Sequence, residues 1–190
     1  MRIVKDPRVR KQEIIDTSLV VFAEKGYEKT SISDIAKAMN ISQGLCYRYF
    51  RSKGEIYDAA LEEYADAMVA NCMENIPEGS SMDSWMNNIG NHVRIMMDNE
   101  SGNEAFHKLF QSEDGHRVYA ELLQKVIAKL EPSVVAMLEK LQADGMLSSS
   151  DLPSLAIAGL YGEMGLLLNE NYALEQKVSA IIDIWTRLLK

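Results

Sequence analysis

The sequence predicts an all-α protein of about nine helices, in which an N-terminal three-helix domain precedes a larger C-terminal helical domain. Apolar side chains recur at intervals of three and four residues along most of the 190-residue chain, and no stretch alternates as a half-buried strand would. Charge divides the chain as well, because residues 1–53 carry 11 Lys and Arg against 6 Asp and Glu, whereas residues 54–190 carry 9 against 22. We therefore place a domain boundary between residues 53 and 54 and expect the basic N-terminal domain to face a polyanion.

The first expected helix covers residues 10–26. Ile14, Leu19 and Phe22 fall on one stripe of it. Gly26 can end it, because glycine readily adopts the left-handed backbone that follows many helices. This helix would close a three-helix domain over the two short helices that come next.

Residues 31–53 contain two short helices joined by a tight turn. Ser31 and Asp34 fit a capping box, which would begin a first helix of about eight residues. Asn40 can take a left-handed backbone in the turn, and Ser42 can accept a hydrogen bond from the first turn of the second helix. This arrangement is a helix-turn-helix motif.

The second helix of the motif, residues 43–49, has an apolar side and a polar side. The inward residues are Leu45, Cys46 and Phe50, and the outward ones are Gln43, Gly44, Tyr47, Arg48 and Tyr49. Gln43 and Arg48 can make paired hydrogen bonds to base edges, and Gly44 lets the backbone approach a ligand closely. Tyr47 adds a phenolic donor that can reach a phosphate.

The next helix begins with a second expected capping box. Ser52 and Glu55 flank Lys53, so that backbone amide groups and a cation would lie at the same helix end. Such an end is a phosphate-binding feature.

Three short motifs in this region resemble those of the TetR family of bacterial repressors. They are T-S-x-x-D-I-A at residues 30–36, I-S-x-G-x-x-Y-x-Y-F at residues 41–50 and S-K-x-E at residues 52–55. The resemblance is specific over residues 10–60 and looser beyond, and Cys46 stands where a leucine is more usual. It implies that the helix at residues 43–49 enters the major groove and that Thr30, Tyr47 and Lys53 hold phosphates.

Residues and resemblance together give a set of candidate contacts to a double-stranded DNA operator. The candidate DNA-binding residues are Thr30, Ser31, Ser42, Gln43, Gly44, Tyr47, Arg48, Tyr49 and Lys53.

Six further helices are expected after the motif. Their approximate bounds are residues 53–75, 82–98, 104–111, 116–144, 152–169 and 174–189. The first of them would link the two domains as one element. Pro132 should kink or divide the long helix at residues 116–144, because proline removes one backbone hydrogen bond.

The C-terminal domain is rich in methionine and holds several aromatic residues. Most of the methionines can be explained as core filler, although a flexible apolar lining would also suit the small-molecule effector that the resemblance implies. His92 lies near an inward stripe, and Glu163 is either a solvated or dimer-edge residue or the counter-charge for a cationic ligand. The candidate ligand-binding residues are Met68, Cys72, Trp85, Ile89, His92, Met96, Phe106, Phe110, Tyr119, Tyr161 and Met164.

Small residues form a smooth stripe on the helix at residues 152–169. The final helix, residues 174–189, carries more apolar surface than one neighbour can cover. Two such helices from each of two chains could form a four-helix bundle about a two-fold axis. The candidate dimer-interface residues are Ala156, Gly159, Gly162, Ile181, Ile184, Trp185 and Leu188.

Other classes of protein find little support. The chain lacks a Gly-x-Ser-x-Gly elbow, a Walker loop, a dinucleotide-binding glycine turn and a His-Glu-x-x-His pair, so we expect no enzyme and no cofactor. The histidines at 92, 107 and 116 lack the spacing of a metal site. Cys46 and Cys72 are expected to be reduced thiols, and the absence of a membrane span or signal peptide indicates a cytoplasmic protein.

Two functions remain open. The first is a homodimeric, ligand-responsive repressor on a near-palindromic operator. The second is a small-molecule or partner-binding helical module whose DNA contact is vestigial or serves activation.

Overall fold

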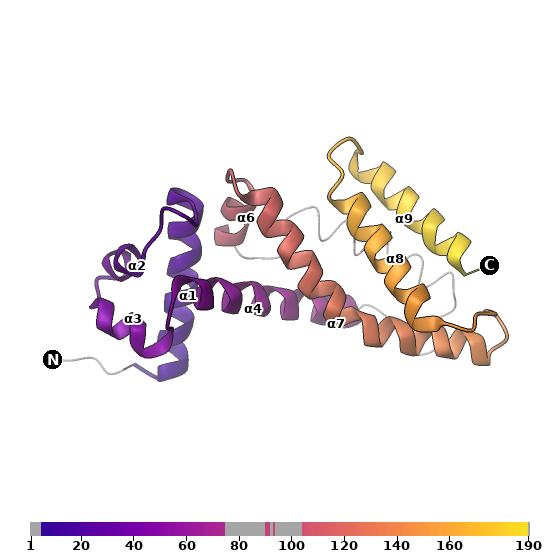
Figure 1. Ribbon diagram of the computed structural model, residues 1–190, viewed down its shortest axis with the longest axis horizontal. Coiled ribbons are helices and arrows are strands. Elements are labelled where there is room, and N and C mark those ends of the chain that lie inside the picture. The colour runs from indigo at the N-terminus through magenta and orange to yellow at the C-terminus, as the bar shows by residue number, and fades with distance from the viewer. Residues whose placement is uncertain (1–4, 75–89, 92, 94–103, 190) are drawn as a thin grey trace. The chain divides into compact units, whose positions relative to one another are not determined.

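The computed structural model describes residues 5–74, 90, 91, 93 and 104–189, and within these residues it is built of helices without a strand. The eight helices with defined bounds are α1 (Pro7–Lys25), α2 (Ile32–Ala38), α3 (Gln43–Tyr49), α4 (Lys53–Glu74), α6 (Glu104–Phe110), α7 (Gly115–Ala143), α8 (Leu152–Leu167) and α9 (Leu174–Leu188) (Figure 1). The all-α prediction is confirmed. The helix expected at residues 82–98 lies outside the described residues except for positions 90, 91 and 93, which are helical.

The chain forms two compact units. The first comprises Met1–Tyr64 with Asn103–Glu121, and the second comprises Ala65–Gly102 with Leu122–Lys190. Helices α4 and α7 each contribute residues to both. The expected boundary between residues 53 and 54 separates two predicted functions, whereas the two units are defined by contacts within the chain. The boundary therefore stays a prediction.

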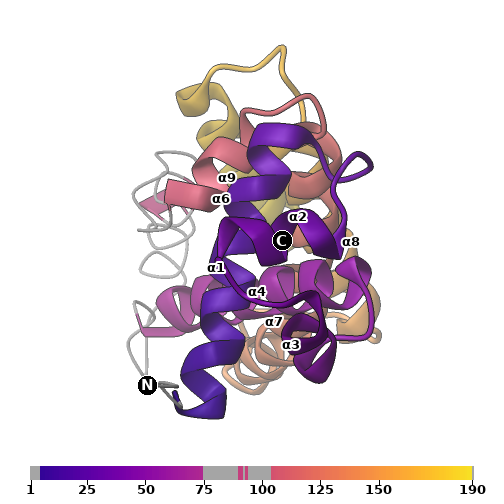
Figure 2. The same cartoon turned by 90° about the vertical axis from the view of Figure 1, so that its left-hand side faces the viewer.

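In the first unit, α1 packs against α2 and α6, and α2 packs against α3 (Figure 2). Ile14, Phe22 and Ile35 are fully buried in its core. The ring of Phe22 contacts those of Tyr27 and Tyr57, with centroids 5.3 and 6.1 Å away. Burial of each large apolar side chain contributes about 1.5 to 3 kcal/mol, so this core holds the short α2 and α3 in place, which could not persist alone.

Local chemistry sets both ends of α1. Asp6 caps the helix by accepting a hydrogen bond from the Arg8 amide at 2.8 Å, and Pro7 occupies the first position, where a missing N–H costs nothing. Gly26 ends the helix with a φ of 84°. The predicted glycine stop is confirmed.

Helix α7 runs through Pro132 from Gly115 to Ala143, so the proline does not divide it. Only one i→i−4 hydrogen bond is lost at a proline, and apolar burial continues on both sides of it. Val126 and Ile127 are buried before it, and Leu138 and Leu141 after it.

In the second unit, α8 and α9 lie side by side as a helical hairpin (Figure 1). A Cβ atom added at Gly159 would lie 2.3 Å from Cη2 of Trp185, so the glycine lets the indole ring sit directly on the α8 backbone. Ala156 and Ile181 are also fully buried within this one chain. The small-residue stripe was expected to lie in a dimer interface, and in the single chain the indole ring of Trp185 covers it at Gly159.

The half-buried Gly162, Ile184 and Leu188 complete the expected dimer set. A Cβ atom at Gly162 would meet Ile184 at 3.6 Å, which is ordinary van der Waals contact. The role of this set in a dimer stays a prediction.

Candidate nucleic-acid interface

The start of α2 is fixed by a reciprocal capping box. The Ser31 amide donates to Asp34 Oδ2 at 2.9 Å, and the Asp34 amide donates to Ser31 Oγ at 3.3 Å. Lys25 Nζ lies 2.8 Å from the other Asp34 oxygen, which ties the end of α1 to the start of α2. The hydrogen bond from Lys25, followed by those from Ser31, holds the pKa of Asp34 well below its usual range. The predicted capping box is confirmed.

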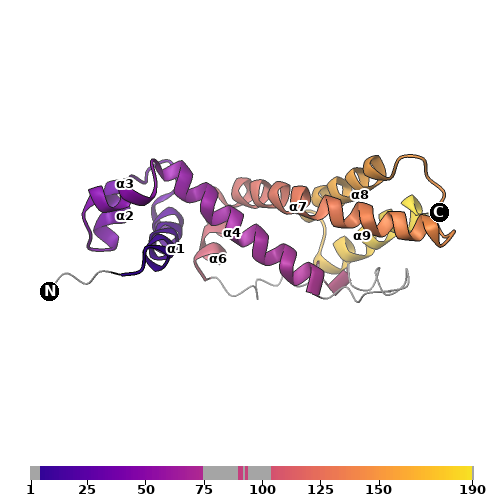
Figure 3. The same cartoon turned by 90° about the horizontal axis from the view of Figure 1, so that it is seen from below.

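The turn between α2 and α3 has the predicted left-handed residue. Asn40 has a φ of 53° and is the one non-glycine residue with positive φ in the described part of the chain. The amide of Ile41 then donates back to the Ala36 carbonyl at 2.9 Å. Ser42 Oγ accepts from the Leu45 amide at 3.3 Å, which begins α3. These contacts fix the turn that joins α2 to α3, which are seen next to each other in Figure 3.

Helix α3 presents a polar face to solvent. Cys46 and Phe50 are buried, while Gln43, Gly44 and Arg48 are exposed. Beyond these, the ring of Tyr47 is about half exposed and Tyr49 is half-buried. The predicted sides are confirmed at Cys46, Phe50, Gln43, Gly44, Tyr47 and Arg48, whereas Leu45, which was expected to be buried, is half-buried like Tyr49.

Gly44 has no structural reason to be glycine in the isolated chain. A Cβ atom added there would meet nothing within 4 Å, and its backbone is helical. Glycine in a helix is less favourable than alanine by up to about 1 kcal/mol. A close approach by another molecule would explain the residue.

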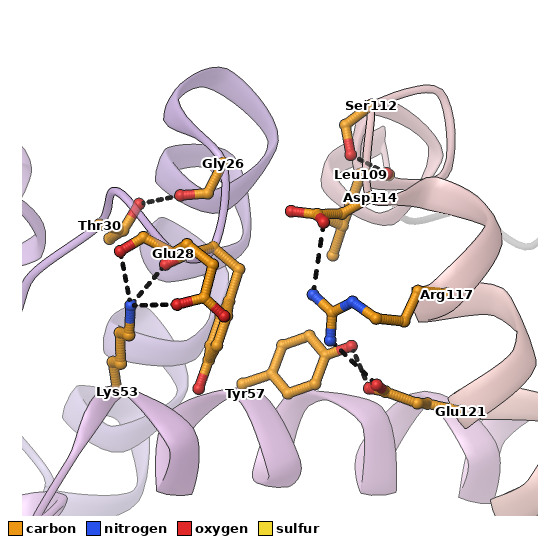
Figure 4. Close-up of polar contacts among 11 residues, drawn as sticks. Gly26, Glu28, Thr30, Lys53, Tyr57, Leu109, Ser112, Asp114, Arg117 and Glu121 are labelled. Atoms are coloured by element: carbon orange, nitrogen blue, oxygen red, sulfur yellow. Dashed lines mark hydrogen bonds and ion pairs between the residues drawn. The ribbon is translucent and has the colours of Figure 1, made fainter.

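Lys53 at the start of α4 is turned toward the chain's own backbone. Its Nζ donates to the carbonyl oxygens of Tyr27 at 2.7 Å and Glu28 at 3.0 Å, and it lies 4.4 Å from the Tyr27 ring centroid (Figure 4). The ammonium group thus anchors α4 to the loop between α1 and α2. Its predicted phosphate contact would compete with these bonds.

The cap of α4 differs slightly from the expected form. Ser52 Oγ accepts from the Glu55 amide at 3.1 Å, as predicted. The Glu55 carboxylate accepts from the amide of Arg51 at 2.6 Å, one residue earlier than a standard capping box requires.

Thr30 is also engaged inside the unit. Its hydroxyl donates to the Gly26 carbonyl at 2.8 Å, its amide donates to Tyr27 at 3.2 Å, and its side chain is buried. The phosphate contact implied for Thr30 stays a prediction, and the described contacts give this residue the role of closing the loop.

Three basic residues around the motif were counted in the charge of the N-terminal domain but not assigned to the interface. Lys29, Lys37 and Arg51 are exposed, and like Arg48 they take part in no ion pair among the residues that the structure describes. In contrast, Lys25 is paired with Asp34. The positions of Lys29, Lys37 and Arg51 next to the motif are the signal in the sequence that could have identified them.

The candidate ligand-binding residues are distributed over the two units and over positions outside the described residues. Phe106, Phe110 and Tyr119 belong to the first unit, where Phe106 stacks on Tyr64 with centroids 4.1 Å apart and Phe110 meets Tyr119 at 5.5 Å. These rings pack against one another. Four further candidates, Trp85, Ile89, His92 and Met96, lie outside the described residues.

The remaining candidates belong to the second unit. Met68 and Cys72 are buried on α4, Met164 is half-buried and Tyr161 is half exposed. Burial, together with the nearby negative charge of Glu163, raises the pKa of Cys72 to about 12. Burial also raises the pKa of Glu163 to about 7, against a hydrogen bond from Trp185 Nε1 at 3.4 Å that lowers it.

The described residues form neither a membrane-spanning helix nor a metal site. Within them, no helix combines the length and apolar character needed to cross a membrane. Over the same residues, no group of three or more His, Cys, Asp or Glu side chains is placed to hold a metal ion.

Comparison with known proteins places the similarity mainly in this interface. A family model described as bacterial regulatory proteins, tetR family, matches residues 14–60. The negative transcriptional regulator IcaR of the biofilm operon icaADBC from Staphylococcus epidermidis is 33% identical over 73 residues, which are 38% of this chain and 40% of that protein. The Staphylococcus aureus IcaR is 42% identical over 52 residues, covering 27% of this chain and 28% of the relative. The alignments therefore span less than half the length of these relatives.

The similarity of fold extends much further than the similarity of sequence. The fatty acid degradation regulator FadR from Bacillus halodurans superposes with a TM-score of 0.67 over 98% of this chain and 97% of its own, at 20% identity. This likeness concerns the fold, because so low an identity does not carry over what is bound.

Proposed function

Since the chain belongs to the TetR family of bacterial regulatory proteins, we propose that it is a homodimeric transcriptional repressor of the cytoplasm, released from a near-palindromic operator by a small, largely apolar effector. The observation that carries this proposal is the polar face of α3. It combines an exposed Gln43 and Arg48 with a glycine that the chain itself does not require, and exposed basic side chains that take part in no ion pair among the described residues lie next to the motif.

Gln43 and Arg48 are the residues for base recognition. An arginine can donate two hydrogen bonds to guanine and a glutamine can pair with adenine in the major groove. Ser42 and Tyr49 flank them on the same helix, and Ser31 lies at the start of α2. Open space above Gly44 allows the α3 backbone to approach the edge of the groove.

Phosphate contacts come from Lys29, Lys37 and Arg51 together with the Tyr47 hydroxyl. These cations need break no ion pair among the described residues before they bind, so their desolvation is the main cost. Lys53 and Thr30 act mainly by shaping the loop between α1 and α2.

A second copy of the chain would bind on the outer face of α8. Ile157 and Tyr161 are 41% and 50% exposed there, and Ala158 and Gly165 on the same face are exposed as well. The helix carries no Lys or Arg and a single acid, so it has little charge to keep a partner away. A two-fold axis would let this patch cover itself and would place two α3 helices about 34 to 36 Å apart, one turn of DNA.

The effector would bind among apolar groups of the C-terminal part of the chain, where Met68, Cys72 and Met164 offer flexible contacts. An effector that binds more tightly to a conformation unable to bind DNA would shift the population away from the DNA-bound conformation.

The test is selection of an operator from random duplexes with the purified protein. We expect enrichment of a near-palindrome with half-sites one helical turn apart, and a mobility shift on the selected DNA that a matched random duplex does not give. Absence of any shift at low salt, where phosphate contacts are strongest, would contradict DNA binding. Compounds that release the selected operator would then identify the effector class.

A further inference from the structure

The first turns of α7 carry a polar cluster that reaches α4. The Glu121 carboxylate accepts from the Tyr57 hydroxyl at 2.6 Å and from Arg117 Nη1 at 2.9 Å (Figure 4). Arg117 Nη2 also lies 3.6 Å from Asp114 Oδ1. Tyr57 is buried, and the bond from its hydroxyl to the half-buried Glu121 is partly shielded from water. All four residues belong to the first unit.

The same arginine faces the loop between α1 and α2. Its guanidinium carbon lies 5.8 Å from the ring centroid of Tyr27, and that ring lies 5.0 Å from the ring of Tyr57. The backbone of Tyr27 is in turn bound by Lys53. Tyr27 is therefore held on one side by α7 and on the other by the first residue of α4.

These contacts flank the DNA-reading motif at both ends. Tyr27 lies four residues before Ser31, the cap of α2, and Lys53 lies three residues after Phe50, the cap of α3. The chain thus enters and leaves the helix-turn-helix through two segments that meet at Tyr27. A change in the position of this ring would move both segments together.

We propose that Arg117 and Glu121 are positioning residues for DNA binding, which act through Tyr57 and Tyr27 to set the orientation of the helix-turn-helix motif. This inference rests on the proposed function. Neither residue is expected to touch DNA. Their effect would be to keep α3 and the surrounding cations in the geometry that fits the groove and the phosphates at once.

Glu121→Gln gives a test in which the sign of the effect is decisive. Removal of a negative charge should by itself strengthen binding to a polyanion, because like charges repel. The amide cannot serve Tyr57 and Arg117 as a carboxylate does, so loss of positioning should weaken operator binding. We expect about a 5- to 50-fold loss, which is in the usual range for energetic coupling between separate groups.

Glu139→Gln is the matched control. Glu139 lies on the same helix, is exposed and takes part in no ion pair among the described residues, and its replacement removes the same charge. Its operator affinity should equal that of the parent or be slightly higher.

Two further measurements separate positioning from a general loss of stability. Tyr57→Phe removes the hydroxyl that binds Glu121, so it should also weaken operator binding. The double variant Tyr57→Phe, Glu121→Gln should have an operator affinity only slightly lower than that of whichever single variant binds more weakly. The slope of log affinity against log salt should fall in these variants, because a misplaced motif makes fewer phosphate contacts. A merely less stable protein that binds through an unchanged interface would keep the slope.

Tyr57→Phe alone decides the matter if Glu121→Gln does not fold. If the parent protein binds a selected operator while Glu121→Gln and Tyr57→Phe bind it as tightly as Glu139→Gln does, the positioning role is refuted and the proposed function stands. If the parent binds no DNA at low salt, the proposed function itself fails.

Discussion

At the scale of the residue, the interface separates cations that are available for DNA from those that the fold already uses. Arg48 and Arg51 are exposed without an ion pair among the described residues, while Lys53 is bound to two carbonyl groups. A count of charges cannot make this distinction, because it depends on contacts across 25 and 26 residues of chain. It leads to different predictions for each type of cation.

Arg48→Ala should relax base preference, whereas Arg51→Ala should weaken binding to all sequences. Loss of a paired hydrogen bond to a base should cost about 1 to 3 kcal/mol at one base pair in each half-site. Loss of a phosphate contact should reduce the slope of log affinity against log salt concentration by about 1 for each phosphate contact that is lost. Competition binding on the operator and on single-base variants measures both. Equal loss on operator and random DNA for Arg48→Ala would show that this residue does not read bases.

Lys53→Ala should destabilise the protein in the absence of DNA. Hydrogen bonds to a charged group contribute about 1.5 to 3 kcal/mol when shielded, and partial exposure of this side chain lowers the expected loss to about 1 to 2 kcal/mol. Arg51→Ala should change the free energy of unfolding by less than about 0.5 kcal/mol. Urea unfolding of both variants gives the comparison. If Lys53→Ala left the urea midpoint of unfolding unchanged, the role of this residue would be phosphate binding alone.

Glu163 should make the stability of the protein depend on pH. Its pKa is raised from 4.5 to about 7 by burial, so the folded state binds its proton more tightly than the unfolded state does. Stability from this group is therefore fully present below about pH 4.5 and is lost as pH rises through about 7. Glu163→Gln should flatten the fall in unfolding free energy between pH 5 and 8. A parent protein whose stability rises over that range, with no change on substitution, would contradict the assignment.

At the scale of the element, the ends of helices were the best predicted features. The caps at Ser31 and Ser42, the left-handed Asn40 and the stop at Gly26 involve partners within four residues. Local sequence determines such contacts, so periodicity and capping chemistry suffice to find them.

Features that depend on distant partners were predicted less well. The stripe with Gly159 was recognised as a packing surface, but nothing in the sequence tells a neighbouring helix of the same chain from one in another chain. Pro132 shows a related limit, because the helix around it is sustained by apolar burial on both sides rather than by local propensity.

Gly159→Ala should destabilise the hairpin of α8 and α9, while Gly165→Ala should not. The added methyl group at Gly159 would overlap the indole ring of Trp185, which overpacking studies suggest costs about 1 to 3 kcal/mol. In the single chain the same change at Gly165 meets nothing within 4 Å and removes a helical glycine, so it should stabilise the folded monomer by up to about 1 kcal/mol. Thermal unfolding of the pair on one helix checks the packing. Equal stability of the two variants would show that the indole ring of Trp185 does not lie against Gly159.

At the scale of the whole molecule, the sequence predicted the all-α class and the DNA-binding family but not how the body is used. The motif at residues 30–55 is short, local and shaped by DNA geometry, and the family model matches over it. The body is described by apolar periodicity alone, which many packings satisfy. The candidate ligand set, whose described members belong to two units, therefore stays a prediction.

In the proposed function, operator binding depends on dimerisation, which is a property of the whole molecule. Once the small-residue stripe is filled by Trp185, the apolar surface that remains on α8 is its opposite face. Tyr161→Glu and Ile157→Glu should therefore separate the subunits and reduce operator affinity by at least about 100-fold, because one motif alone makes too few contacts. Each side chain is exposed in the single chain, so the monomers should remain folded.

Met146→Glu is the control, because this residue is similarly exposed at 49% but lies in the segment between α7 and α8. Sedimentation velocity should show monomers for the two α8 variants and dimers for Met146→Glu, with circular dichroism spectra like that of the parent for all three. Should Tyr161→Glu and Ile157→Glu sediment as dimers with normal operator affinity, the outer face of α8 is not the interface. The half-buried Gly162, Ile184 and Leu188 would then be the next surface to test, since a modest shift of α9 could expose them to a second chain.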